Sequence, residues 1–228
     1  MNLLGIETSS AVGSVALATP GGVHVREIAT PREQTEQVLK LVDELLAAAG
    51  CPLEQLDGIA FGRGPGSFTG LRVSAAIAQG LAVASNLPVL PVSSLLCLAE
   101  RAWREAGCER CLVCVDAHMG EVYWAETVRR DGVVQVVGPE RLGAPADVAV
   151  PAGGAAWAAI GSGFAAPGPG QELAGLLARA TRVLAQLQPS AADLFPQAAR
   201  DLAAGRGVAA AAALPVYLRE QTAWRRSS

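Results

Sequence analysis

The stretch Gly62-Arg63-Gly64-Pro65-Gly66-Ser67-Phe68-Thr69-Gly70-Leu71-Arg72 combines four glycines, one proline and two arginines. It follows the apolar run 58–61, which is typical of a β-strand, and precedes the Ala-rich segment 71–85, which is typical of a helix. Backbone N–H groups at such a junction can bind an anion or the acceptors of a partner. The stretch therefore predicts an α/β fold and marks a first candidate site.

Neither of two common phosphate-binding motifs fits this stretch. A Walker loop needs glycine, four residues and then Gly-Lys-Ser/Thr, which no register supplies. The dinucleotide motif G-x-G-x-x-G fails because Ser67 or Thr69 stands where its third glycine belongs. Two interpretations stay open: a tight connection whose glycines take positive φ angles, or a loop whose backbone binds an anion or a partner.

The predicted helix 71–85 carries two rows of small residues. Ala76, Gly80 and Ala84 repeat at four-residue spacing, and a parallel row is formed by Ser74, Ala78 and Ala82. Small side chains let another helix approach closely. Because the segment is apolar nearly all round, we expect it to be buried within the fold or completed by a partner.

The rest of the chain predicts a mixed α/β protein with two similar lobes. The first lobe is expected over 1–106, with 207–228 returning to it, and the second over 107–206. Strands are predicted at 3–6, 14–18, 23–28, 58–61, 89–92, 111–116, 122–128, 133–137 and 158–160. Helices are predicted at 33–49, 71–85, 94–104, 171–186 and 191–204. The segment 139–170 is rich in Gly, Pro and Ala.

Composition narrows the class of protein. A net charge of −3 supplies no basic field with which the chain alone would hold nucleic acid, so any tRNA contact is expected through a complex. The start of the chain lacks the basic and apolar regions of a signal peptide. No apolar run is long enough for a membrane span, so no membrane contact is expected and the prediction is cytoplasmic.

Three cysteines, Cys108, Cys111 and Cys114, resemble the start of an iron–sulfur ligand run. Residues 111–115 are apolar and typical of a strand, which would put Cys111 and Cys114 on opposite faces. A fourth ligand would have to be Cys51 or Cys97. We therefore expect core packing, and any further role stays open.

Few side chains qualify as catalytic or metal-binding residues. His24 and His118 form no metal-binding pair, and no G-x-S-x-G elbow is present, so no metal site and no catalytic residue are predicted. Asp116 is the best lone carboxylate, although capping of the strand end explains it equally well. Two segments offer hydroxyls or turn amides to phosphate oxygens: Glu7-Thr8-Ser9 and Gly161-Ser162-Gly163. Ordinary turns are the alternative for both.

Taken together, these segments resemble the bacterial TsaB family, also called YeaZ. The resemblance rests on the stretch 62–72 and on LGIETS at 4–9, DAHMGEVY at 116–123 and PVYLR at 215–219, and it covers essentially the whole chain. The chain departs from the family at Gln34-Thr35-Glu36, where members often carry His-Ser-Glu, and at His118, where they often carry arginine.

The resemblance implies an actin-like, sugar-kinase-like fold with a mixed sheet and flanking helices in each lobe. It also implies a role in forming N6-threonylcarbamoyladenosine beside the anticodon of tRNAs that read codons beginning with A. In the family, TsaB is a non-catalytic paralogue of TsaD. Metal and threonylcarbamoyl adenylate are expected on the TsaD-like partner and ATP on a TsaE-like ATPase, with no cofactor on this chain and a homodimer when it is isolated.

TsaB-like chains pair with TsaD through helices of the first lobe. The residues expected at that interface are Val38, Leu41, Val42, Leu45, Leu71, Ser74, Ala76, Ile77, Ala78, Gly80 and Leu81. The nucleotide-binding function of Glu7, Thr8, Ser9, Gly161, Ser162 and Gly163 is expected to be vestigial. An ATPase or small-molecule kinase of the same fold is the alternative, and a metallopeptidase is disfavoured by the two histidines.

Overall fold

The computed structural model describes residues 1–30, 33–151 and 154–219. The chain divides into two compact units, one formed by 1–97 and 189–216, the other within the described residues by 98–188 and 217–219. In the described parts, no helix is long and apolar enough to cross a membrane.

The first unit is built on a five-stranded sheet in the order β3-β2-β1-β4-β5. Strand β1 pairs antiparallel with β2 and parallel with β4, β2 pairs antiparallel with β3, and β4 pairs parallel with β5. The strands are β1 (Leu3–Glu7), β2 (Gly13–Thr19), β3 (Gly22–Ile28), β4 (Gly58–Gly64) and β5 (Val89–Ser93).

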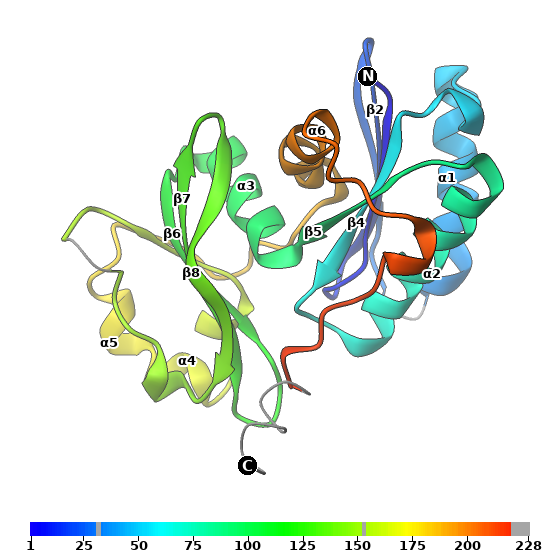
Figure 1. Ribbon diagram of the computed structural model, residues 1–228. Helices are drawn as coiled ribbons and strands as arrows, with labels where there is room; N and C mark the ends of the chain where they lie inside the picture. The colour runs from blue at the N-terminus through cyan, green and yellow to red at the C-terminus, as the bar shows by residue number, and fades with distance from the viewer. Residues whose placement is uncertain (31–32, 152–153, 220–228) are drawn as a thin grey trace. The chain divides into compact units, whose positions relative to one another are not determined.

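Helices cover both faces of this sheet (Figure 1). On one face α1 (Gln34–Ala49) and α2 (Phe68–Ser85) pack against side chains such as Ile6 and Phe61. On the other face α6 (Phe195–Ala203) packs against alternate residues of the same strands, such as Leu3. Because β1 is buried on both faces, its residues 3–6 form a continuous apolar run and not an alternating one, and Glu7 ends the strand.

The second unit repeats the same topology. Its sheet has the order β10-β9-β6-β7-β8, with β6 antiparallel to β7 and parallel to β9. Strand β7 is antiparallel to β8, and β9 is parallel to β10. The strands are β6 (Arg110–Asp116), β7 (Val122–Arg130), β8 (Val133–Gly143), β9 (Ala158–Ile160) and β10 (Arg182–Leu184). Each unit therefore places its first strand in the centre, between an antiparallel meander and two parallel strands.

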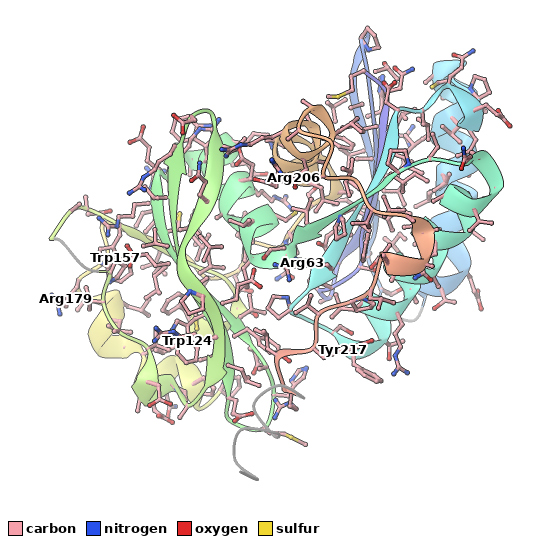
Figure 2. The ribbon with its side chains drawn as sticks, viewed as in Figure 1. Arg63, Trp124, Trp157, Arg179, Arg206 and Tyr217 are labelled. Carbon is pink, nitrogen blue, oxygen red and sulfur yellow. The ribbon has the colours of Figure 1, made fainter. Side chains whose placement is uncertain are left out.

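Three further helices accompany the second sheet. Helix α3 (Ser94–Ala106) begins in the first unit and continues into the second, and α4 (Pro169–Glu172) and α5 (Ala174–Leu177) are one turn long. The core on one face contains Trp124 and Trp157 (Figure 2), together with Leu112, Ala159 and Phe164. The duplicated mixed sheets with flanking helices confirm the predicted actin-like fold of two related lobes.

Several predicted boundaries need correction. The predicted helix 171–186 is wrong: α4 and α5 are short, and β10 occupies its last part because it pairs with β9. The units also divide the chain differently from the predicted lobes. Residues 189–206 belong to the first unit, since Phe195 and Ala198 of α6 pack on its sheet, whereas 98–106 and 217–219 belong to the second.

Candidate functional site

The stretch 62–72 is only in small part a loop. Gly62, Arg63 and Gly64 end β4, and α2 begins at Phe68 after the N-cap Ser67, whose hydroxyl accepts from the Gly70 N–H at 3.3 Å. Phe68, Thr69 and Gly70 are therefore the first helical turn, and Arg72 lies one turn on, 3.8 Å above the Phe68 ring. Pro65 and Gly66 alone connect the strand to the cap. We call residues 62–72 the signature segment.

Three of the four glycines in the signature segment are required by close packing. Only Gly64 has a positive φ angle, at +101°. A Cβ atom at Gly66 would lie 2.5 Å from the Ser9 carbonyl oxygen, and one at Gly70 would lie 1.7 Å from that of Thr8. At Gly62 it would lie 2.0 Å from a Glu7 carboxyl oxygen. The interpretation that these glycines serve positive φ angles is therefore wrong at three positions.

The turn 7–9 and the signature segment form one hydrogen-bonded unit. The Thr8 hydroxyl donates to the Gly70 carbonyl at 2.7 Å. The Ser67 N–H donates to the Ser9 carbonyl at 2.8 Å, and the Ser9 N–H donates to Glu7 Oε1 at 2.6 Å. The Thr8 hydroxyl and the Ser9 N–H, which the sequence predicted as possible phosphate ligands, are thus hydrogen-bonded within the chain.

Glu7 is the most unusual group of this site. It is fully buried at the end of β1, and its Oε2 accepts from the Ser94 hydroxyl at 3.0 Å. Burial raises the pKa of the Glu7 carboxyl, and hydrogen bonds from Ser9, Ser94 and Thr8 oppose the rise. The sequence did not predict the contact between Ser94 and Glu7. A serine at the start of a helix indicates an N-cap, and its local pattern does not indicate a hydrogen bond to a carboxylate far away in the sequence.

We expect the Glu7→Gln variant to gain stability relative to the unmodified chain as the pH rises. A raised pKa means that the folded state favours neutral Glu7. The stability that the unmodified chain gains from protonated Glu7 is therefore complete below about pH 4.5 and is lost as the pH rises through the folded pKa. Glutamine stays neutral throughout, and the surrounding Thr8, Ser9, Gly62 and Ser94 do not titrate in this range. The difference in unfolding free energy should grow by about 1.4 kcal/mol per pH unit within that interval.

Urea denaturation of both chains at pH values from 4.5 to 8 measures this difference. A difference that stays constant with pH would show that the folded and unfolded states bind the Glu7 proton equally.

The second predicted nucleotide segment lies in the other unit. The Ser162 hydroxyl accepts from the Asp116 N–H at 3.1 Å, so it supports the end of β6. Cβ atoms at Gly161 and Gly163 would lie 2.4 Å from the Cys114 carbonyl and 2.6 Å from its sulfur. Glycine is therefore required at both positions by close packing against Cys114. Within the described residues, the contacts of this segment do not indicate a bound ligand.

The turn after β6 is held by a residue from the end of the chain. Arg219 donates to Glu121 at 2.5 Å and to the Ala117 carbonyl at 2.8 Å. Asp116 accepts from the His118 N–H at 2.9 Å, as expected for a carboxylate that caps the strand end. The family resemblance included Arg219, but nothing in its sequence neighbourhood indicated this contact.

The predicted interface residues divide into three groups. Two are exposed: Ala76 and Gly80. Three are partly buried against the core: Leu41, Ile77 and Leu81. The other six are buried and cannot touch a partner while the unit stays folded: Val38, Val42, Leu45, Leu71, Ser74 and Ala78. This part of the prediction is wrong, because the apolar periodicity of both helices marks the face that packs on their own sheet.

Two of the three cysteines 108, 111 and 114 are placed as core residues. Cys111 and Cys114 are buried, and burial raises the pKa of both thiols to about 12. Cys108 is half-buried. Among residues 1–30, 33–151 and 154–219, no cluster of three or more histidine, cysteine, aspartate or glutamate side chains could hold a metal ion.

Comparison with known proteins identifies the family. The family model for TsaD, tRNA N6-adenosine threonylcarbamoyltransferase, matches residues 7–223. The tRNA threonylcarbamoyladenosine biosynthesis protein TsaB of Escherichia coli K12 is 40% identical over 99% of this chain and 98% of its own length.

Two solved structures from Pseudomonas aeruginosa have the same fold. One is described as YeaZ and the other as an uncharacterized protein with similarity to peptidase YEAZ. Both are 40% identical to this chain and cover 95% of it and 99% of their own chains, with TM-scores of 0.85 and 0.88. The chain therefore belongs to the TsaB (YeaZ) family, within the wider family of TsaD.

Proposed function

We propose that this chain takes part in forming N6-threonylcarbamoyladenosine in tRNA as a subunit that binds and activates a TsaD-like catalytic subunit. The full-length relative named for this biosynthesis supports the pathway. In this proposal, metal and threonylcarbamoyl adenylate bind to the TsaD-like chain, ATP binds to a TsaE-like ATPase, and tRNA binds to the complex. The modified adenosine lies beside the anticodon of tRNAs that read codons beginning with A.

One observation carries the non-catalytic part of the proposal. The turn that would face a phosphate in the first unit is packed against the chain's own signature segment. Thr8 donates to Gly70, the Ser9 carbonyl accepts from Ser67, and Gly62 lies against the Glu7 carboxyl. A nucleotide phosphate at this turn would have to displace the start of α2, which disfavours the alternative of an ATPase or kinase.

The exposed side of α2 supports the partner-binding part. A Cβ atom at Gly80 would meet no other atom within 4 Å, and Val83 on the same helix is 74% exposed. Phe68 at the start of the helix is half-exposed beneath Arg72. An apolar helix surface with small side chains lets a partner helix approach closely.

Reconstitution with the cognate TsaD-like and TsaE-like chains tests the proposed function. We expect the modified nucleoside in tRNA, measured by mass spectrometry, to appear only when this chain is present. Unchanged modification without this chain would contradict the proposal. Calorimetry of the isolated chain with millimolar ATP and magnesium tests the alternative, and measurable binding would support it.

A tryptophan at Gly80 should block association with the TsaD-like chain. The site is open, so the Gly80→Trp variant should fold normally, while the added ring prevents close approach of a partner helix. We expect at least about a hundredfold loss of affinity in calorimetry, since misfit at the centre of an interface costs several kcal/mol. Ala203→Trp is the matched control, because Ala203 is exposed at the end of α6 in the same unit. Equal affinities of the two variants would place the interface elsewhere.

A further inference from the structure

The Glu7 carboxyl is buried without a cation. Both of its oxygens accept hydrogen bonds, from the Ser9 N–H at 2.6 Å and from the Ser94 hydroxyl at 3.0 Å. Within the part of the chain that the structure describes, no lysine, arginine or histidine forms an ion pair with it. Burying a carboxyl group is costly unless it is hydrogen-bonded, and an apolar side chain would avoid that cost altogether. Core packing alone therefore does not explain why a carboxyl group occupies this position.

The same carboxyl fixes the position of β4 where the signature segment begins. The Gly62 Cα lies so close that a Cβ there would fall 2.0 Å from Oε2 and 2.6 Å from the Glu7 carboxyl carbon. Gly62 in turn accepts from the Ser74 hydroxyl of α2 at 3.3 Å. Glu7 thus contacts one end of the signature segment directly.

A chain of hydrogen bonds links Glu7 to the other end of the segment. The Ser9 N–H is held by Glu7, and the Ser9 carbonyl accepts from the N–H of Ser67, the N-cap of α2. Next to Ser9, the Thr8 hydroxyl donates to the Gly70 carbonyl in the first turn of α2. The turn 7–9 is therefore hydrogen-bonded both to the N-cap and to the first turn of α2.

We propose that Glu7 is a positioning residue that sets the start of α2 through the turn 7–9, and so prepares the exposed side of α2 for its partner. This inference rests on the proposed function, in which α2 binds the TsaD-like chain. Glu7 has no exposed atom, so its effect on the partner must pass through Ser9, Ser67 and the helix itself.

The test compares partner affinity in three chains by calorimetry with the purified TsaD-like chain. Glu7→Ala removes both acceptors and should weaken binding roughly tenfold, in line with other couplings through packed networks. Glu7→Gln should restore most of the affinity, because its oxygen can accept from the Ser9 N–H and its amide can donate to the Ser94 oxygen. Wild-type affinity in Glu7→Ala, or no recovery in Glu7→Gln, would overturn the inference.

A matched control separates positioning from general loss of stability. Glu100 is also a buried glutamate, but it lies in the second unit. Glu100→Ala should lower the unfolding midpoint while leaving the affinity of the folded protein within about twofold of wild type. If Glu100→Ala weakens binding as much as Glu7→Ala does, the effect is one of stability and the inference fails.

Two outcomes beyond these are informative. If Glu7→Ala does not fold, Ser94→Ala removes only the hydroxyl that donates to Oε2 and should still weaken binding by about threefold; an unchanged affinity would overturn the inference. If the wild-type chain itself does not bind the TsaD-like chain, the proposed function fails, and the positioning role fails with it.

Discussion

Replacing Gly70 by alanine should lower the free energy of unfolding by about 3–4 kcal/mol. The added Cβ atom would lie 1.7 Å from the Thr8 carbonyl oxygen and 2.9 Å from its carbon, and both are backbone atoms that no rotamer change can move. Overpacking alone costs about 1–3 kcal/mol, and the shift would also break the hydrogen bond from Thr8 to the Gly70 carbonyl. Such a loss is a large fraction of the stability of an ordinary domain.

Gly80→Ala is the matched control in the same helix. Gly80 is exposed, and a Cβ atom there meets nothing within 4 Å. Alanine is the better helix former, so this variant should gain about 0.5–1 kcal/mol. Far-ultraviolet circular dichroism in urea compares the two variants, because it reports the helices and strands of both units, whereas the described tryptophans Trp103, Trp124 and Trp157 all lie in the second. Equal stabilities of the two variants would contradict the packing account of Gly70.

The glycines of the signature segment show how far sequence reasoning reaches. Local composition indicates a strand, a turn and a helix between 58 and 85, and this is what β4 and α2 form. The reason for the glycines could not be read locally, because the atoms that exclude a side chain belong to Glu7, Thr8 and Ser9, far earlier in the chain. Contacts between distant segments leave no trace in a local pattern.

The candidate interface shows a second limit. Helix periodicity separates an apolar face from a polar one in α1, but it does not say whether the apolar face meets the chain's own sheet or a partner. Val38, Val42 and Leu45 belong to the core. The burial of each side chain in the folded unit is needed to show that Ala76 and Gly80 are the exposed positions among the predicted interface residues. Strand β10 was missed for a related reason, since three residues become a strand only through pairing with β9.

Replacing Arg129 by methionine should cost the second unit about 3–5 kcal/mol. Arg129 forms an ion pair with Glu100 of α3, whose side chain is only 9% exposed. It also donates to the Gly132 carbonyl at 2.6 Å and lies 4.4 Å from the centre of the Trp103 ring. Removing the cation leaves a buried carboxylate without its partner, which is among the most destabilising single changes in a folded protein.

Glu100→Gln in the Arg129→Met background should recover about 1–2 kcal/mol, because it removes the unpaired charge. In the unmodified chain the Val134 N–H donates to Glu100 at 3.0 Å, and the glutamine oxygen can still accept this hydrogen bond. Tryptophan fluorescence in urea measures this, since Trp103, Trp124 and Trp157 lie in the second unit. Lys40→Ala is the control, and because Lys40 lies in the first unit, its unfolding in urea is followed by far-ultraviolet circular dichroism. The Lys40–Glu44 pair is exposed, with 75% and 47% of the side chains accessible, and should contribute less than about 0.5 kcal/mol. If Arg129→Met costs no more than Lys40→Ala, the Glu100–Arg129 pair does not hold α3 to the second sheet.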